Sequence, residues 1–339
     1  MSKFRVLTKI LPLYCILLSS CGGGGSDGTA DSPPPVEIYR FEKDFFALDT
    51  LQFNASLEAL RGKAPLFFDT HFNNVFGIRP GDTSGYAPLK AALTNPYVRA
   101  IASDIDSVYP GMENLGAALA DAFQRYRADF PKEALPSVFT YPACISGFQP
   151  AVWNADSLLA IGIDCFLGKD YYFYQTTGYP RYITRRFSPE HLVPTALKGF
   201  VQYRYPPDTE DPAFLSSIIY EGKVLYLLDR MLPGTPDSLK IGYTAAEMGW
   251  AETYERNIWA YFIERGLLYS ADAQDYRKYL DEAPFTSDLG TQSAPRIGAF
   301  TGWRIVRKYM EENKEISLPA LMAEKDAQKV LSRSKYKPK

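Results

Sequence analysis

The sequence predicts a mainly helical α+β fold with one small antiparallel sheet in the middle of the chain. Three observations lead to this class. Apolar residues recur at helical spacing over residues 115–130. Short runs rich in Val, Ile, Phe and Tyr, separated by turn residues, follow between 137 and 163. From residue 189 onwards the helical spacing returns.

The elements follow from these patterns in chain order. Residues 36–46 read as a short strand or an extended entry, and the apolar segments 65–68 and 75–77 read as anchored loops. Strands are expected at 137–145, 149–152 and 157–163, with turns at 147 and 154–156. Helices are expected at 50–60, 86–94, 96–108, 115–130, 189–203, 212–231, 244–264, 271–283, 296–313 and 318–323.

Three helix starts carry capping signals. Asn95 precedes a proline that suits a first helical turn, and Ser188 precedes another. Thr244 and Glu247 have the spacing of a capping box, in which each side chain bonds the other residue's backbone N–H.

Residues 1–20 have the features of an export signal. Residues 1–9 are basic, residues 10–18 are apolar, and small residues follow. The apolar run is shorter than the roughly 18–20 residues that span a bilayer. The segment Leu18-Ser19-Ser20-Cys21 resembles a bacterial lipobox, which implies that Cys21 is acylated and becomes the mature N-terminus. The alternative is an ordinary signal peptide that contains a cysteine.

Residues 21–36 read as a tether, because they are rich in Gly, Ser and Pro and contain little that could be buried. Several acyl chains on Cys21 would anchor this tether firmly to a membrane. Glycine rather than aspartate follows Cys21, and by resemblance to lipoprotein sorting signals this favours the periplasmic face of the outer membrane. Residues 37–339 are expected to form a single globular domain.

Composition limits the function classes. The chain has 339 residues, of which 46% are hydrophobic and 14% aromatic, so it can bury a substantial core. A formal net charge of −2 gives no electrostatic basis for binding nucleic acid.

Two cysteines remain in the globular part. Cys144 and Cys165 lie in flanking strand-like runs, and an oxidising periplasm would permit a disulfide between them. Two separate buried thiols are the alternative.

Motifs for metal or cofactor chemistry are missing from the sequence. There are only two histidines, and no HExxH, GxSxG, Walker or GxGxxG motif occurs. A zinc-binding helix that starts with His191 would need a second histidine at position 195, which is Thr195. We therefore expect no metal, no cofactor and no catalytic residue.

A candidate functional surface is centred on Glu221, which lies inside an apolar helix. A buried carboxylate is costly unless it is paired, and Lys223, Arg185, Arg186 or Arg204 could pair it. The pair is either a structural ion pair or part of a ligand site. Arg181, Arg185 and Arg186 also form a basic patch that could hold a carboxylate or phosphate, and pairing with internal acids is the alternative.

Glu255 completes this set of candidates. It shares one face of the expected helix 244–264 with Glu252, and two acids on one face can act as an acid–base pair. A solvated acidic stripe is the alternative.

Several sequence blocks together resemble the gliding-motility lipoprotein family (GldB). The resemblance runs from about residue 37 to the C-terminus. Glu221 departs from the family pattern, in which many members have an uncharged residue before Gly-Lys. The blocks are FEKDFF (41–46), IGIDCFLGKDYY (161–172), YITRRFSPE (182–190), EGKVLY (221–226), GLLYS (266–270), PRIG (295–298), GWRIV (302–306) and SKYKP (334–338).

The resemblance implies a lipoprotein of the Bacteroidota envelope linked to gliding motility and the associated secretion system. The family also looks similar to zinc peptidases in which an HExxH helix precedes a helix with a Glu-Gly pair. Here Glu221-Gly222 matches the second helix, but the helix from His191 lacks the second histidine and the base. This implies a zincin-like scaffold without its metal.

Two functions remain open. The first is a non-catalytic scaffold that binds protein components of the gliding or secretion machinery and is held to the membrane by its lipid. The alternative is a periplasmic hydrolase of peptide or glycan that uses carboxylates such as Glu221 and Glu255.

Overall fold

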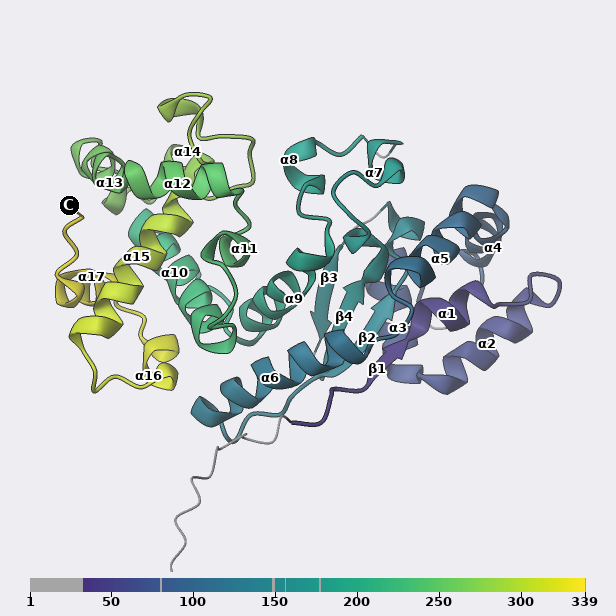
Figure 1. Cartoon of the computed structure of the whole chain (residues 1–339). Helices are drawn as coiled ribbons and strands as arrows, with labels where there is room; N and C mark the ends of the chain where they lie inside the picture. Colours follow the sequence, from purple (N-terminus) through teal and green to yellow (C-terminus); the bar gives the residue numbers. More distant parts are fainter. Residues whose placement is uncertain (1–32, 80, 148–149, 156, 177, 339) are drawn as a thin grey trace, which may run out of the picture. The chain divides into compact units, whose positions relative to one another are not determined.

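The computed structural model describes residues 33–79, 81–147, 150–155, 157–176 and 178–338 (Figure 1). The expected signal peptide, Cys21 and most of the expected tether lie outside the described residues. The strands are β1 Ile38–Arg40, β2 Ser137–Tyr141, β3 Val152–Ala155 and β4 Leu158–Gly162. The helices are α1 Phe41–Phe46, α2 Phe53–Lys63, α3 Pro65–Phe76, α4 Tyr86–Thr94, α5 Pro96–Val108, α6 Glu113–Asp129, α7 Tyr172–Thr176, α8 Arg181–Thr184, α9 Pro189–Arg204, α10 Phe214–Met231, α11 Asp237–Ile241, α12 Ala245–Thr253, α13 Glu255–Glu264, α14 Ala273–Tyr276, α15 Ile297–Glu312, α16 Leu318–Ala323 and α17 Ala327–Ser334.

The mainly helical α+β class is confirmed, but the sheet is mixed rather than antiparallel. Its strand order is β1-β2-β4-β3. β2 is parallel to both β1 and β4, and only β3 runs antiparallel to its neighbour β4. The central strand β4 is buried at every residue, which is typical of a strand covered on both faces.

The strand bounds also differ from the prediction. β2 ends at Tyr141 because Pro142 has no N–H for the ladder, and a short 3-10 turn follows. β3 begins at Val152, and Asn154 and Ala155, expected in a turn, pair with β4.

Figure 1 places the sheet beside the N-terminal helices, with the helices from α10 to α17 gathered on the other side of α9. α9 contacts both β3 and α10, so it joins the two groups. α10 and α15 form the most extensive helix pair, and α17 packs on both of them. No helix in the described part of the chain is long and apolar enough to cross a bilayer.

α10 and α15 meet backbone to backbone at two glycines. A Cβ on Gly302 would lie 1.6 Å from the Ile218 carbonyl oxygen, and a Cβ on Gly222 would lie 2.2 Å from the Gly302 carbonyl oxygen. This close approach gives a structural reason for the Gly222 that follows Glu221 in the sequence.

An ionic cluster also fixes these helices. The Asp229 carboxylate of α10 accepts two hydrogen bonds from Arg307 of α15, both at 2.7 Å, and one from Trp303 Nε1 at 2.9 Å. Lys240 of α11 adds a bond to Asp229 at 2.9 Å. The guanidinium of Arg307 stacks on the Trp303 ring at 3.8 Å. Three helices are therefore held by one carboxylate whose partners are all charged or aromatic.

The segments 65–68 and 75–77, expected as loops, belong to one helix, α3. Pro65 occupies its first turn and Gly77, with φ +67°, ends it. Its buried face inserts His71 among aromatic rings. The Phe67 ring stacks on the imidazole at 5.3 Å, and the Tyr141 ring meets it edge-on at 4.6 Å.

The short strand or extended entry expected over residues 36–46 is confirmed at β1 and is wrong from Phe41, where α1 begins. Glu42 of α1 is 1% exposed. Its carboxylate accepts hydrogen bonds from Arg40 Nε at 2.7 Å and from Thr140 Oγ1 at 2.6 Å. The buried charge is thus satisfied by Arg40 of β1 and by Thr140 of the neighbouring strand β2.

The expected helices 86–94 and 96–108 have the predicted bounds, and Asn95 caps α5 by accepting a hydrogen bond from the Tyr97 N–H at 2.9 Å. The capping box of Thr244 and Glu247 is also present. The expected helix 244–264 is wrong as one element, because Tyr254 separates α12 from α13. The helix expected over 271–283 is shorter in the structure, since only residues 273–276 are α-helical and a 3-10 turn follows.

Candidate functional site

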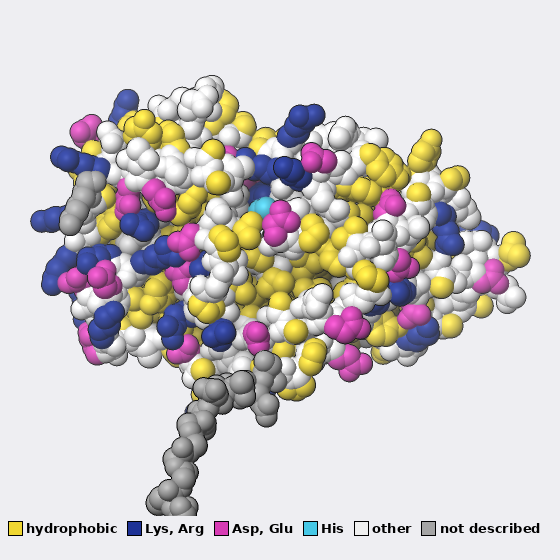
Figure 2. All heavy atoms as spheres, in the orientation of Figure 1, with side chains coloured by type: hydrophobic (Ala, Val, Ile, Leu, Met, Phe, Trp, Pro, Cys, Tyr) yellow, Lys and Arg dark blue, Asp and Glu magenta, His cyan; other side chains and the backbone are white. Residues whose placement is uncertain are grey.

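A charged cavity of about 240 Å³ lies beside α9 and is the strongest candidate site. Basic side chains gather on this face of the molecule, around the position that α8 has in Figure 1 (Figure 2). α9 contributes His191 and Lys198, the segment before it contributes Arg186, and two segments from the C-terminal half contribute Glu282 and Arg296.

Salt bridges link the charged side chains of this cavity in two groups. Glu282 Oε1 accepts hydrogen bonds from Arg186 Nη1 at 2.7 Å and from Arg296 Nη1 at 3.0 Å. Lys198 Nζ donates to Glu221 Oε2 at 3.2 Å. Five charges from distant parts of the chain therefore meet at one place.

The cluster holds both carboxylates in their ionised form. Burial acts to raise the pKa of Glu221, but the charges of Lys198 and Arg296 outweigh it and keep this pKa below its usual value. The pKa of Glu282 is lowered for the same reason, by Arg296 and Arg186 against burial. Burial lowers the pKa of Lys198, and the Arg296 charge adds to that effect. Neither carboxyl has the raised pKa that a general acid needs at neutral pH.

Arg296 has an unusual backbone and an incomplete set of partners. It precedes α15 in the left-handed region, with φ +50°. A cation at a helix N-terminus faces the positive end of the helix dipole, so its position here is electrostatically unfavourable by itself. Its side chain is nearly buried, with Nη1 bound to the Ile241 carbonyl oxygen at 3.0 Å and to Glu282. Its Nη2 has no hydrogen-bond partner among the described residues.

The predicted partners of Glu221 are wrong, since its partner is Lys198 rather than Lys223, Arg185, Arg186 or Arg204. Arg186 lines the cavity together with Lys198, the partner of Glu221, whereas Arg185 pairs with Glu247 at 2.7 Å. The structure therefore brings Glu221 and Arg186 into one cluster, and Lys198, Glu282 and Arg296 are members that the sequence analysis missed.

Ser188 begins α9 as expected, but its side chain does not cap the helix backbone. Its hydroxyl instead lies 2.9 Å from Nδ1 of His191. Burial lowers the pKa of His191, and the neighbouring Arg186 and Arg185 charges act in the same direction against Glu190. The imidazole is accordingly neutral at pH 7.

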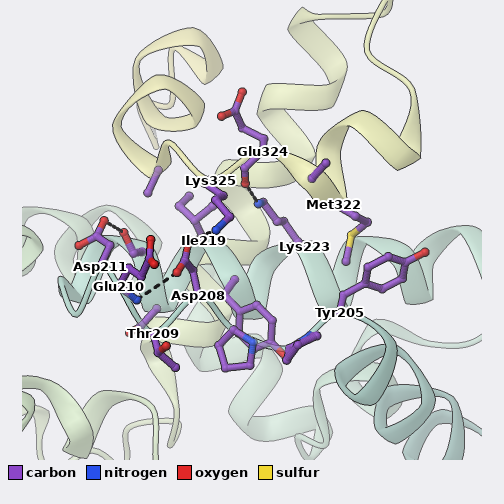
Figure 3. A pocket seen from close by; sticks show the side chains of 17 residues that line it. Tyr205, Asp208, Thr209, Glu210, Asp211, Ile219, Lys223, Met322, Glu324 and Lys325 are labelled. Atoms are coloured by element: carbon purple, nitrogen blue, oxygen red, sulfur yellow. Dashed lines mark hydrogen bonds and ion pairs between the residues drawn. The ribbon is translucent and has the colours of Figure 1, made fainter. Parts of the chain in front are cut away.

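Lys223 lies in a different hollow, a groove of about 440 Å³ that Figure 3 shows from close by. Its ammonium points toward Glu324 and donates a hydrogen bond to that residue's carbonyl oxygen. Tyr205 and Met322 lie on one side of Lys223 in this view, and the acids lie on the other. The acids on that side are Asp208, Glu210 and Asp211.

Glu255 lies in a third place. Its carboxylate accepts hydrogen bonds from Arg304 Nε at 3.0 Å and from the Tyr336 hydroxyl at 2.8 Å. Because Tyr254 breaks the helix, Glu252 and Glu255 belong to separate helices, although both line one surface hollow. Glu255 does not belong to the charged cavity.

Cys144 and Cys165 are present as thiols rather than as a disulfide, so the expected bridge stays a prediction. Between them lies Asp164, which is fully buried. Its two carboxylate oxygens accept hydrogen bonds from the backbone N–H groups of Ala143 and Cys144, both at 2.7 Å. Burial raises the pKa of Asp164 to about 6, although these hydrogen bonds act to lower it.

Within the described ranges, no group of three or more His, Cys, Asp or Glu side chains is placed to hold a metal ion. The lipidation site Cys21 lies outside those ranges.

Comparison with known proteins gives one match. Residues 27–338 match the family described as gliding motility protein GldB. Searches among curated proteins and among solved structures found no match, so the expected likeness to zinc peptidases stays a prediction. Because the match spans nearly the whole chain, this protein belongs to the gliding motility protein GldB family.

Proposed function

We propose that the chain is an envelope lipoprotein that binds protein components of the gliding motility machinery and its linked secretion apparatus, and that it catalyses no reaction itself. The family match over residues 27–338 carries this proposal, because it includes every element of the described fold. The lipid on Cys21 would hold the protein at the periplasmic face of the outer membrane.

The state of the candidate carboxylates supports a binding role over hydrolysis. A glycoside hydrolase needs two carboxyl groups across one scissile bond, one of them protonated. Glu221 is held ionised by Lys198 and Arg296, and Glu255 is bound by Arg304 and Tyr336 in another hollow. The two residues do not form such a pair.

The groove beside Lys223 is the surface that we assign to the partner. Its rim segment Asp208–Asp211 is exposed and carries three acids. Asp208 is bound to Lys325 at 3.0 Å, and the groove floor includes Tyr205 and Tyr220. Acids on the rim and tyrosines on the floor favour a partner segment that presents basic and apolar side chains.

Site-specific cross-linking in cells tests this proposal. A photoreactive residue replaces Thr209 on the groove rim of the full chain, and a matched control replaces Leu51, which is 92% exposed and lies before α2. We expect motility or secretion components to cross-link to position 209 and not to position 51.

Other outcomes would contradict the proposal. Recovery of only general lipoprotein-sorting factors at both positions would remove the motility link. Accumulation of an uncleaved peptide or glycan in cells that carry Glu221→Gln or Glu255→Gln would point to the hydrolase instead.

A further inference from the structure

We propose that the cavity beside α9 is a carboxylate-binding site, in which Arg186, Lys198 and Arg296 hold one carboxylate group of a small acid or of a peptide end. This site is separate from the groove at Lys223, so it does not depend on the proposed function. Three observations carry the assignment.

The first observation is an excess of positive charge. Three cations, Arg186, Lys198 and Arg296, meet two carboxylates, Glu221 and Glu282. Lys240 and Arg185 do not change this balance, because Lys240 is bound to Asp229 and Asp237, and Arg185 is bound to Glu247. The Glu190 carboxylate lies 4.0 Å from His191 and is 56% exposed, so solvent screens its charge. One positive charge is left, and a single carboxylate would neutralise it.

The second observation is the unsatisfied guanidinium donor. Arg296 is 5% exposed, and its Nη2 has no hydrogen-bond partner among the residues that the structure describes. A buried donor without a partner is costly, and most costly when it is charged. An oxygen atom bound in the cavity would supply the missing acceptor.

The third observation is a glycine next to Arg186 in the lining of the cavity. Gly242 lines the cavity with φ +78°, and a Cβ there would lie 3.0 Å from Cδ of Arg186. The missing Cβ at this position therefore leaves room for the Arg186 side chain. A volume of about 240 Å³ admits a small acid or the last residue of a peptide.

A carboxylate fits better than a phosphate for reasons of shape and charge. The planar fork of a guanidinium matches the two oxygens of a carboxylate. A phosphate monoester carries −1.5 to −2 charges at pH 7 and would leave the cluster negative.

Calorimetric titration of the full chain in detergent tests the site. N-acetylalanine carries one carboxylate, and N-acetylalaninamide is its neutral control. We expect the acid to bind and the amide not to bind. Lys198→Met should weaken binding of the acid about tenfold, the effect of losing one charge-assisted hydrogen bond. Lys325→Met, in the groove and 73% exposed, should leave binding unchanged.

Gly242→Ala provides a variant that alters no charge. It should also weaken binding of the acid, because the added methyl would lie 3.0 Å from Cδ of Arg186 and would shift that side chain. A pentapeptide with a free C-terminus shows whether the bound carboxylate comes from a peptide end or from a small acid. Tighter binding of the pentapeptide than of N-acetylalanine indicates a peptide end, and equal binding indicates a small acid. Equal binding of the acid and the amide, tighter binding of inorganic phosphate, or acid binding that survives both cavity variants would overturn the proposal.

Discussion

Replacing His71 with phenylalanine should stabilise the protein, and more so in mild acid. His71 is fully buried, and neither ring nitrogen has a hydrogen-bond partner among the described residues. Its neighbours are the rings of Phe67, Tyr141 and Trp153, at 5.3, 4.6 and 5.9 Å. Burial in this apolar cage lowers the pKa of His71 to about 3, so the native imidazole stays neutral.

The magnitude follows from the two buried nitrogens and from this pKa. At pH 7, removing unsatisfied polar atoms from the core should gain about 1–2 kcal/mol, after a small loss from tighter packing. The unfolded chain binds a proton at His71 below pH 6.5, whereas the native chain does so only near pH 3. Stability of the wild type therefore falls as the pH drops below 6.5, and at pH 5 this one residue accounts for about 2 kcal/mol of the fall.

Urea unfolding followed by tryptophan fluorescence at pH 7 and pH 5 measures both effects. His71→Phe should exceed the wild type by about 1–2 kcal/mol at pH 7 and by about 3–4 kcal/mol at pH 5. Phe72→Leu is the control, because it alters packing beside His71 without removing a titrating group. A His71→Phe advantage that is the same at both pH values would refute the reasoning.

Three further predictions concern stability. Gly302→Ala should cost at least about 3 kcal/mol in thermal or urea unfolding, because its Cβ would overlap the Ile218 carbonyl. Gly249→Ala in α12 is the control: a Cβ there would have nothing within 4 Å, so the substitution should stabilise the protein by about 0.5–1 kcal/mol. Equal effects of the two substitutions would contradict the close helix crossing. Asp164→Asn removes a carboxyl whose pKa is raised to about 6. The stability of the wild type relative to this variant should therefore fall by about 3 kcal/mol as the pH rises from below 4 to above 6. A pH-independent difference would contradict the raised pKa. Asp229→Asn should cost about 2–3 kcal/mol in the same assay, because Arg307 and Lys240 lose a partly buried carboxylate and keep only Asp237. Asp281→Asn in an exposed pair should change little, and similar losses would refute the role of the Asp229 cluster.

Local signals in the sequence predicted most of the helices. The Asn95-Pro96 pair and the Thr244 capping box act over a few residues, and the structure confirms both. Pairing in the sheet could not be predicted in the same way. β1 comes from residues 38–40 and lies beside β2, about a hundred residues further along the chain, so no local pattern determines that the two are parallel.

The charged cavity was predictable only in part. Glu221 stood out because an acid in an apolar helix needs a partner, but four wrong partners were proposed for it. Lys198 looked like an ordinary polar position on α9, and tertiary packing alone brings it to Glu221. Arg296 carried one local signal that could have been noticed, a cation directly before a helix, where the dipole disfavours it.

The position of β1 has a mechanical consequence for a protein tethered by its N-terminus. A pull on the tether would reach the described fold at residues 36–40, where the Val36 N–H bonds the Gly116 carbonyl oxygen of α6 at 3.0 Å and β1 follows as an edge strand of three residues. Detaching that strand would carry Arg40 away from Glu42 and leave a carboxylate that is 1% exposed without its cation. For a chain anchored through Cys21, the Val36–Gly116 hydrogen bond and the Arg40–Glu42 ion pair are therefore the first contacts that tension on the N-terminus would break.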